Sequence, residues 1–373
     1  MTSELEIKTE RLCRLLEAEN LGGVLLGAQH NFAWLTGGRS NAVNTATEAG
    51  ASFLLVGCDG RRFVLASNIE MPRLLREEIA AADFEPVEFS WTEEKASGDF
   101  VLRLAERLFK NGGAAAADLF LCNAGRVIEN RIASCRYSLT AEEIERYRRL
   151  GRDAGAALGE ALTNDVAPGE SETEIAEKIR RRLAARGIAA LVALVGADER
   201  IELFRHPLPT AKRWEKVLLA AVCARREGLV ANLSRIVCAG PVPPELASKT
   251  EAAARVFARL LAATRAGATG AELYRAAREG YAENDLADEI GRHHQGGATG
   301  YKTREWIAHP ASAETVRDDQ AFAWNPTVTG TKIEETCIVI DGAPEIITAT
   351  PGFPRLSVAA GGEQFTASGI LSL

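Results

Sequence analysis

Residues 214–238 read WEKVLLAAVCARREGLVANLSRIVC, a largely apolar stretch broken in its middle by charged residues. This pattern predicts two strands, Trp214–Ala224 and Leu229–Cys238, joined by a charged hairpin tip at residues 225–228. Helical patterns flank the hairpin and a strand pattern follows; these elements are the helices Leu139–Leu162, Glu172–Arg186, Pro244–Ala263 and Gly270–Glu283 and the strand Ile333–Ile340. The chain from residue 139 onward is therefore expected to form a mixed α/β unit.

The stretch before this unit predicts a second α/β arrangement. Its expected elements are a helix at Glu4–Glu19, a strand at Gly23–Leu26, a hairpin of Ser52–Val56 and Arg62–Ala66, helices at Met71–Ala81 and Asp99–Phe109, a last strand at Leu119–Leu121 and a linker at Arg131–Ser138. Thr140 and Glu143 then form a capping-box sequence that begins a new helix. Since domains average about 150 residues, a chain of 373 residues suggests two, which we place at 1–137 and 138–373.

Composition excludes several classes of function. The chain carries 44 Lys+Arg and 51 Asp+Glu, a net charge of −7, and it has no basic block, so we expect neither a nucleic-acid nor an anionic-membrane partner. The apolar stretches are shorter than the ~20 residues of a membrane span, and the charged amphipathic N-terminus does not resemble a signal peptide. The seven cysteines are scattered without a CxxC pair, which favours a reduced, cytoplasmic protein.

Candidate functional residues gather in four short motifs. His206 lies in Phe-Arg-His-Pro-Leu-Pro, directly before the first hairpin strand, and His293 and His294 open His-His-Gln-Gly-Gly-Ala-Thr-Gly-Tyr, whose glycines allow a close backbone approach to a ligand. The other two motifs are Trp-Asn-Pro at residues 324–326 and Lys-Ile-Glu-Glu-Thr at residues 332–336. Each motif alone is typical of a turn, a loop or a strand edge, so we give weight to their order along the chain.

That order resembles the pita-bread superfamily of methionine aminopeptidase, prolidase, aminopeptidase P and creatinase. The family's histidine before a strand, hairpin motif, Gly-His-Gly-x-Gly loop, Glu-Pro and Ile-Glu-Asp-Thr correspond here to His206, 228–235, 294–297, 325–326 and 333–336. The resemblance implies an α/β (α+β) chain with a creatinase/prolidase-like N-terminal domain followed by a pita-bread catalytic domain. It also implies a homodimer in which the N-terminal domain helps to close the partner's pocket.

The family's metal ligands are largely replaced. Metallopeptidases of this family hold two divalent ions with Asp, Asp, His, Glu and Glu. The first Asp corresponds to Ala221 or Cys223, depending on where the hairpin is gapped. The second Asp corresponds to Asn232 and the first Glu to Asn325. The family's histidine and second Glu are retained as His294 and Glu334. One carboxylate and two amides cannot balance about four positive charges, so we expect no dinuclear metal site. The alternative is a single Zn²⁺ on Cys223, His294 and Glu334.

Creatinase hydrolyses a C–N bond without metal through the histidine that precedes the first hairpin strand. His206 occupies that position, and an imidazole suits general acid/base work near neutral pH. The hypothesis assigns Glu334 to orienting or deprotonating water or to binding a cationic group, and His294 to polarising a carbonyl or amidine. Which of His293 and His294 faces the pocket stays open.

The substrate-binding assignments follow from side-chain chemistry. Asn232 and Asn325 are expected to hydrogen-bond a polar substrate, and Arg205 and Arg304 to hold a substrate carboxylate. The equally weighted alternative for Arg304 is a salt bridge with Glu305 or another acid. Creatine itself is disfavoured, because Ser234 stands where creatinase carries a glutamate.

The favoured function is a metal-independent hydrolase of a C–N bond in a small polar metabolite. A second interpretation is an Xaa-Pro dipeptidase or aminopeptidase with unusual metal ligands. A third is a catalytically inactive relative that binds a small molecule, a peptide or a protein.

Overall fold

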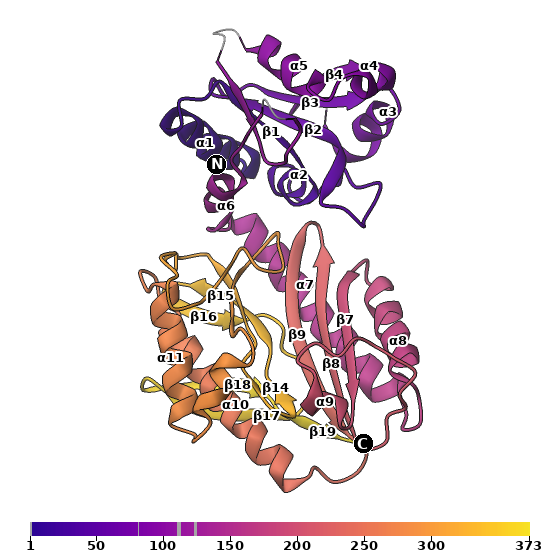
Figure 1. Ribbon diagram of the computed structural model, residues 1–373, viewed down its shortest axis with the longest axis vertical. Helices are drawn as coiled ribbons and strands as arrows, with labels where there is room; N and C mark the ends of the chain where they lie inside the picture. The colour runs from indigo at the N-terminus through magenta and orange to yellow at the C-terminus, as the bar shows by residue number, and fades with distance from the viewer. Residues whose placement is uncertain (1, 81, 110–112, 123–124) are drawn as a thin grey trace. The chain divides into compact units, whose positions relative to one another are not determined.

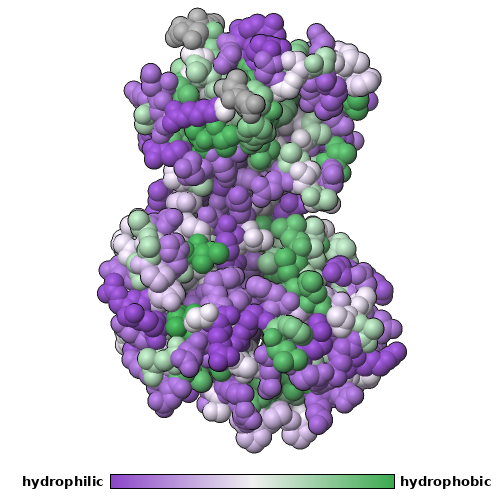
Figure 2. Space-filling view, in the orientation of Figure 1, coloured by the Kyte–Doolittle hydropathy of each residue, from purple (hydrophilic) through white to green (hydrophobic). Residues whose placement is uncertain are grey.

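The computed structural model describes residues 2–80, 82–109, 113–122 and 125–373. The chain divides into two compact units, Met1–Arg136 (unit 1) and Tyr137–Leu373 (unit 2), which Figure 1 shows in indigo to purple and in magenta to yellow. Within the described part of the chain, helices long and apolar enough to cross a membrane are absent. On the face that Figure 2 shows, hydrophilic residues predominate, and hydrophobic ones form smaller, separated patches.

Unit 1 is built on a six-stranded sheet in the order β4-β3-β2-β1-β5-β6. Its strands are β1 (Gly23–Ala28), β2 (Ala49–Gly57), β3 (Arg62–Ser67), β4 (Glu85–Phe89), β5 (Ala115–Ala117) and β6 (Arg126–Val127). Its helices are α1 (Glu4–Ala18), α2 (Gln29–Leu35), α3 (Met71–Arg73), η1 (Leu74–Glu78), α4 (Trp91–Ala96), α5 (Phe100–Leu108) and α6 (Glu129–Arg136). The predicted hairpin is confirmed as β2–β3, in which Ser52 pairs with Ala66.

Three expectations for unit 1 differ from the structure. The predicted strand Leu119–Leu121 is irregular; the strand lies earlier, at Ala115–Ala117, where three small residues fit between β1 and β6. The carboxylate of Asp118 then accepts the backbone N–H groups of Gly27 and Ala28 and so ends the pairing. The expected linker Arg131–Ser138 is mostly the helix α6, and the predicted helix Met71–Ala81 ends at Glu78, with residue 81 outside the described residues.

Unit 2 contains two principal sheets, ordered β19-β9-β8-β7 and β11-β10-β12-β15-β16. The strands are β7 (Ala189–Ala197), β8 (Val217–Arg226), β9 (Leu229–Cys238), β10 (Gly296–Thr299), β11 (Trp306–Ile307), β12 (Ala321–Trp324), β13 (Thr327–Val328), β14 (Thr331–Lys332), β15 (Glu335–Ile340), β16 (Ala343–Ile346), β17 (Arg355–Ala360), β18 (Glu363–Ser368) and β19 (Ile370–Ser372). The helices are α7 (Ala141–Glu160), η2 (Ala161–Asp165), α8 (Glu172–Ala184), α9 (Arg200–Leu203), α10 (Pro244–Ala263), α11 (Gly270–Ala282) and η3 (Ala287–Gly291).

The central hairpin β8–β9 forms where the sequence predicted it. Glu227 and Gly228 both have positive φ at its tip, the conformation that lets a two-residue turn follow the twist of the strands. Thr140 accepts the backbone N–H of Glu143 and caps α7 as expected. Helix α7 packs against β9 and α8 against β7, as Figure 1 shows.

The second half of unit 2 surrounds an apolar core. Helices α10 and α11 pack together and share this core with β10, β12 and β15; Trp324, Phe322 and Phe257 are among its members. A backbone hydrogen bond of 3.2 Å from Ser234 to Glu334 joins β9 to the residue before β15. This contact connects the two principal sheets at the point where the polar motifs lie.

The Gly-Gly pair after His294-Gln295 is required by packing. A Cβ on Gly296 would lie 2.0 Å from the carbonyl oxygen of Ala323, and the φ of Gly296 is +109°. A Cβ on Gly297 would lie 2.1 Å from the carbonyl oxygen of Trp306. The two glycines therefore let β10 fit between β11 and β12 and fix the position of the histidines just before it.

Replacing Gly296 by alanine is expected to lower the free energy of unfolding by about 2–4 kcal/mol, because backbone strain and the clash with Ala323 add. Urea unfolding followed by tryptophan fluorescence measures the change. Gly291→Ala is the matched control, since its Cβ would meet nothing within 4 Å among the described residues. Equal urea midpoints for the two variants would contradict the packing argument.

Candidate functional site

Adjacent strands of unit 2 place the residues of separate motifs side by side. Trp324 pairs with both Gly296 and Glu335, so Asn325 and Glu334 continue the β12–β15 register by one residue. On its other side Glu334 forms an isolated bridge with Ser234. Two positions before Ser234, the backbone N–H of Asn232 donates to the hydroxyl of Thr336. The hairpin motif, Asn-Pro and Ile-Glu-Glu-Thr therefore meet at one place.

Two cations lie against the carboxylate of Glu334. The Nζ of Lys332 is 2.9 Å from its Oε2, and a terminal guanidinium nitrogen of Arg304 is 3.5 Å from its Oε1. The side chains of Lys332, Glu334 and Arg304 are only 4, 6 and 13% exposed. This cluster has two buried positive charges for one negative charge.

The pKa of Glu334 reflects these contacts. Burial raises the pKa of the carboxyl, but Lys332 and Arg304 lower it more, so the net pKa lies below its ordinary value. Glu334 is therefore an ionised carboxylate with both oxygens beside cations.

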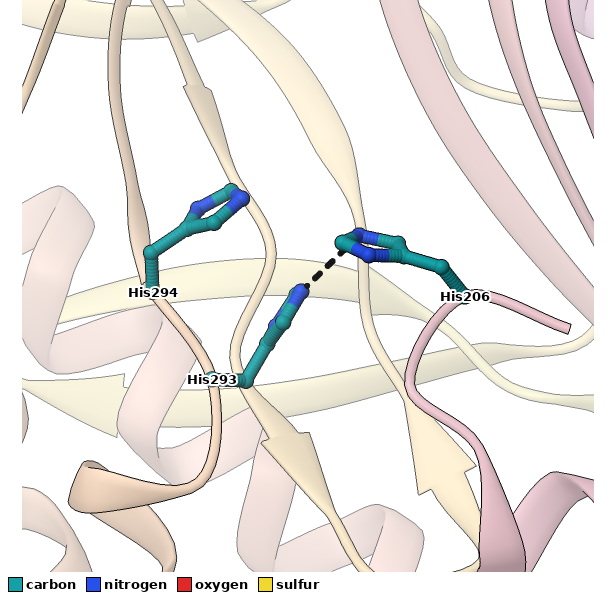
Figure 3. Close-up of side chains that lie close together, drawn as sticks. All are labelled: His206, His293 and His294. Carbon is teal, nitrogen blue, oxygen red and sulfur yellow. Dashed lines mark hydrogen bonds between the residues drawn. The ribbon is translucent and has the colours of Figure 1, made fainter.

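Three histidines form a second cluster, drawn in Figure 3. His206 follows α9, and His293 and His294 precede β10; the Nε2 atoms of His206 and His293 are 3.2 Å apart. The rings of His293 and His294 stack with centroids 4.5 Å apart. Both His293 and His294 thus lie beside His206, which answers in part the question that the sequence left open.

The histidines are neutral imidazoles. Burial lowers the pKa of His293 to about 2 and that of His294 to about 4; the charge of Lys332 acts in the same direction on both rings, and that of Arg304 on His294. The pKa of His206 is also lowered, first by burial and then by Lys332. The charges of Lys332 and Arg304 thus affect the pKa values of the histidines, so we treat the ion cluster around Glu334 and the histidine cluster as one polar site.

Several buried polar atoms of this site have no hydrogen-bond partner among the residues that the structure describes. They are Asn232 Oδ1, Ser234 Oγ, His294 Nδ1, Arg304 Nε and Asn325 Oδ1. Buried polar atoms are nearly always paired, with protein, water or a ligand. These acceptors and donors are therefore available to water or to a polar ligand.

Two residues singled out from the sequence have protein partners instead. Arg205 donates to Glu289 (2.7 Å) and to Thr329 (2.8 Å), although one of its terminal nitrogens is buried without a partner in the described structure. Cys223 pairs with Asn232 across β8–β9, and burial raises the pKa of its thiol to about 12. A thiol this weakly acidic is a poor metal ligand, because metals bind the thiolate.

The model described as Metallopeptidase family M24 matches residues 145–341, more than half of the chain. The chain belongs to metallopeptidase family M24. The match includes the β8–β9 hairpin, the three histidines, Asn325 and Glu334, and it confirms the predicted pita-bread superfamily.

Solved structures share the fold of this M24 protein along almost its whole length. The prolidase of Pyrococcus horikoshii OT3 is 16% identical with a TM-score of 0.76, covering 92% of this chain and 98% of that chain. The X-Pro aminopeptidase of Thermotoga maritima MSB8 is 19% identical (TM-score 0.72; 92 and 98% covered). The N-terminal domain of the FACT complex subunit SPT16 from chickpea, Cicer arietinum, is 13% identical (TM-score 0.69; 92 and 96% covered). Curated proteins yield no match.

These likenesses confirm the predicted fold class, an α/β chain with an N-terminal domain before a pita-bread domain. At such low identities they show the fold alone. The function of this M24 protein has to be argued from its own site.

The donor set does not fit the pair of divalent ions expected of a metallopeptidase. The sequence resemblance assigns the ligand positions to Ala221 or Cys223, Asn232, His294, Asn325 and Glu334, and in the structure Glu334 is already paired with Lys332 and Arg304. Hard divalent ions select carboxylate oxygens, and two buried cations repel them. The residues present therefore do not fit a dinuclear centre.

Within the described ranges, one group of three side chains is close enough to share a metal ion, namely His206, His293 and His294, whose ligand atoms lie within 4.8 Å of one another. The alternative set of Cys223, His294 and Glu334 is not such a group. The three imidazoles satisfy the distance criterion for one ion, but Lys332 and Arg304 oppose added positive charge beside them.

Sequence reasoning missed the two residues that complete the site. Lys332 lies in the Lys-Ile-Glu-Glu-Thr motif, but it was assigned no function from the sequence. Its position two residues before Glu334 on an extended segment predicts that the two side chains lie on the same face. Thr327, which contacts His293 Nδ1 at 3.2 Å, gave no signal in the sequence.

Proposed function

We propose that this M24 protein hydrolyses a C–N bond in a small, polar, carboxylate-bearing substrate without a dinuclear metal centre. The observation that carries the proposal is the set of five unpaired buried polar atoms beside a cluster of net positive charge. His206 acts as the general acid/base, as expected from its position before β8.

The unpaired atoms suggest the chemistry of the substrate. Asn232 Oδ1 and Asn325 Oδ1 accept hydrogen bonds and so suit the N–H groups of an amine, an amide or an amidine. Arg304 Nε–H donates and suits a carboxylate, as does the positive charge of Lys332. A molecule with both kinds of group, such as an N-acyl or N-carbamoyl amino acid or a dipeptide, complements the site.

Glu334 and His294 have supporting roles in this proposal. The ionised carboxylate of Glu334 orients the attacking water or a cationic group of the substrate. His294, with an unpaired Nδ1, polarises the carbonyl or amidine that is attacked. The expectation of a homodimer belongs to the same proposal and rests on the family resemblance.

An Xaa-Pro peptidase fits about as well and is the second candidate. Solved structures that share the fold include the Xaa-Pro dipeptidase from Bacillus anthracis (17% identity, TM-score 0.72). The third interpretation, a binding protein without turnover, is kept because the fold also occurs in a domain of a complex subunit.

The deciding experiment incubates the full chain, purified with Mn²⁺, Co²⁺ and Zn²⁺ present, with Xaa-Pro dipeptides and with N-acyl and N-carbamoyl amino acids. Elemental analysis measures bound metal, and mass spectrometry detects C–N cleavage. We expect cleavage that survives chelation. Two bound metal equivalents with metal-dependent Xaa-Pro cleavage would establish the second candidate instead, and binding without turnover would establish the third.

Arg304→Met tests the carboxylate contact. Because a charge-assisted hydrogen bond contributes about 1.5–3 kcal/mol, we expect KM for a cleaved acid to rise by about 10- to 100-fold. KM for the corresponding neutral amide should change little. Arg255→Met on α10, an arginine with a side chain 49% exposed, is the control. Equal losses for the acid and the amide would argue against this contact.

A further inference from the structure

A chain of hydrogen bonds connects the proposed acid/base to the backbone of the Asn-Pro motif. The hydroxyl of Thr327 donates to the carbonyl oxygen of Asn325 (3.0 Å). The hydroxyl oxygen of Thr327 also lies 3.2 Å from His293 Nδ1, and His293 Nε2 lies 3.2 Å from His206 Nε2. Figure 3 shows the edge of His293 directed at the ring of His206.

Only one arrangement of protons satisfies all three contacts with neutral rings. The hydroxyl proton of Thr327 is donated to the carbonyl oxygen of Asn325. Thr327 Oγ1 must therefore accept a hydrogen bond from His293, which must carry its proton on Nδ1. His293 Nε2 is then a bare lone pair, so the proton between the two rings belongs to His206 Nε2. In a neutral His206 this leaves Nδ1 as the basic atom.

We infer that His293 is a positioning residue that holds the Nε2 proton of His206, so that Nδ1 of His206 is the atom that exchanges protons during the reaction. This inference rests on the proposed function. It adds that Nδ1 of His206 is the reacting atom and that His293 selects it. Thr327 in turn selects the tautomer of His293. The amino acids of three separate segments, at 206, 293 and 327, thus act as one unit.

The proton balance of the step is simple. When His206 Nδ1 takes a proton from water or substrate, the ring becomes an imidazolium and its Nε2–H bond to His293 becomes charge-assisted. When Nδ1 returns the proton to the leaving nitrogen, both rings are neutral again. His293 stays neutral throughout and shares the charge through its lone pair.

Such support matters because the surroundings disfavour a positive ring. Burial lowers the pKa of His206 most, Lys332 and Arg304 lower it further, and Glu334 raises it. His293 itself is in the field of Lys332, His294 and Arg205. The lone pair on Nε2 of His293 offsets part of the repulsion between a protonated His206 and these cations, and it does so without adding a buried negative charge.

The tautomers can be observed directly. The full chain has five histidines, so ¹⁵N-histidine labelling gives a simple long-range ¹H–¹⁵N spectrum, assigned with His206→Gln and His293→Gln. At neutral pH we expect a protonated Nε2 and bare Nδ1 for His206, and the reverse for His293. A His206 ring protonated on Nδ1 would overturn the inference, as would loss of both Nε2 resonances to a metal ion carried by the purified protein.

Kinetics supply the second readout. His293→Leu, which has no acceptor, should lower kcat at least about tenfold with KM nearly unchanged and should shift the acidic limb of the pH profile, which reports the pKa of His206, to lower pH. His293→Gln keeps an acceptor oxygen and should recover part of the rate. Thr327→Val, which lacks the hydroxyl, should reduce kcat, whereas Thr327→Ser, which keeps it, should have a kcat close to that of the wild type. A His293→Leu enzyme with the wild-type kcat and pH profile would refute the positioning role.

The two proposals fail separately. A protein that shows the expected tautomers but turns over none of the substrates refutes the proposed function and leaves the His206–His293 assignment standing. An active protein with the opposite tautomers refutes only the positioning role.

Discussion

His206→Ala is expected to abolish nearly all turnover, lowering kcat by about 10²- to 10⁴-fold while KM changes little. This is the usual contribution of a positioned general acid/base. The side chain lies at the solvent side of the histidine cluster and, among described residues, hydrogen-bonds only with His293, so its removal costs little packing. Initial rates on the substrate found in the screen measure the effect.

His309→Ala is the matched control for this prediction. His309 is an exposed histidine of the same unit, outside the cluster, whose Nδ1 accepts the backbone N–H of Ala311. We expect its kcat to equal that of the wild type. Unimpaired turnover by His206→Ala would remove the central residue of the proposed mechanism.

Glu334→Gln is expected to cost about 3–5 kcal/mol in the free energy of unfolding. The variant leaves the buried charges of Lys332 and Arg304 without their anion, and an uncompensated buried charge is strongly destabilising. The double variant Glu334→Gln/Lys332→Met should recover much of the loss, because it removes one of the two cations. Urea unfolding at pH 7 measures both.

Because Glu334 is titratable, we expect the free energy of unfolding to depend on pH. The folded pKa of Glu334 lies below the ordinary value of 4.5, so its carboxylate stabilises the fold fully above that value and loses this contribution as pH falls through the lower folded pKa. In Glu334→Gln this part of the acid sensitivity should disappear. Glu245→Gln, which breaks an exposed pair with Lys249, is the control and should leave the urea midpoint unchanged. Identical pH profiles for wild type and Glu334→Gln would show that the ion cluster does not stabilise unit 2.

Features with local causes were predictable. Thr140 and Glu143 cap a helix because both partners lie within one turn, and residues 214–238 form a hairpin because the apolar runs and the turn are contiguous. The strand expected at Leu119–Leu121 failed for a nonlocal reason. Three alanines pair with β1 and β6, and the buried carboxylate of Asp118 fixes where that strand ends.

The candidate site was predictable as a set of residues but not as an arrangement. The spacing of Lys332 and Glu334 places both on one face of an extended segment, so their pairing was within reach of the sequence. The ion pair of Arg304 with Glu334 depends instead on the loop between β10 and β11. Arg304 forms a salt bridge through one terminal nitrogen, with Glu334 as the acid, and the substrate contact proposed for its Nε stays a prediction.

The sequence by itself determined the central hairpin, the capped helix α7 and the pita-bread superfamily, because these follow from residue type, short-range spacing and the order of the motifs. Only the tertiary structure decided that His206 lies against His293, 87 residues later, and that the hydroxyl of Thr327 lies against His293 Nδ1. The reason is that a hydrogen bond between distant segments depends on strand register and on the close packing permitted by Gly296 and Gly297, neither of which a local pattern encodes.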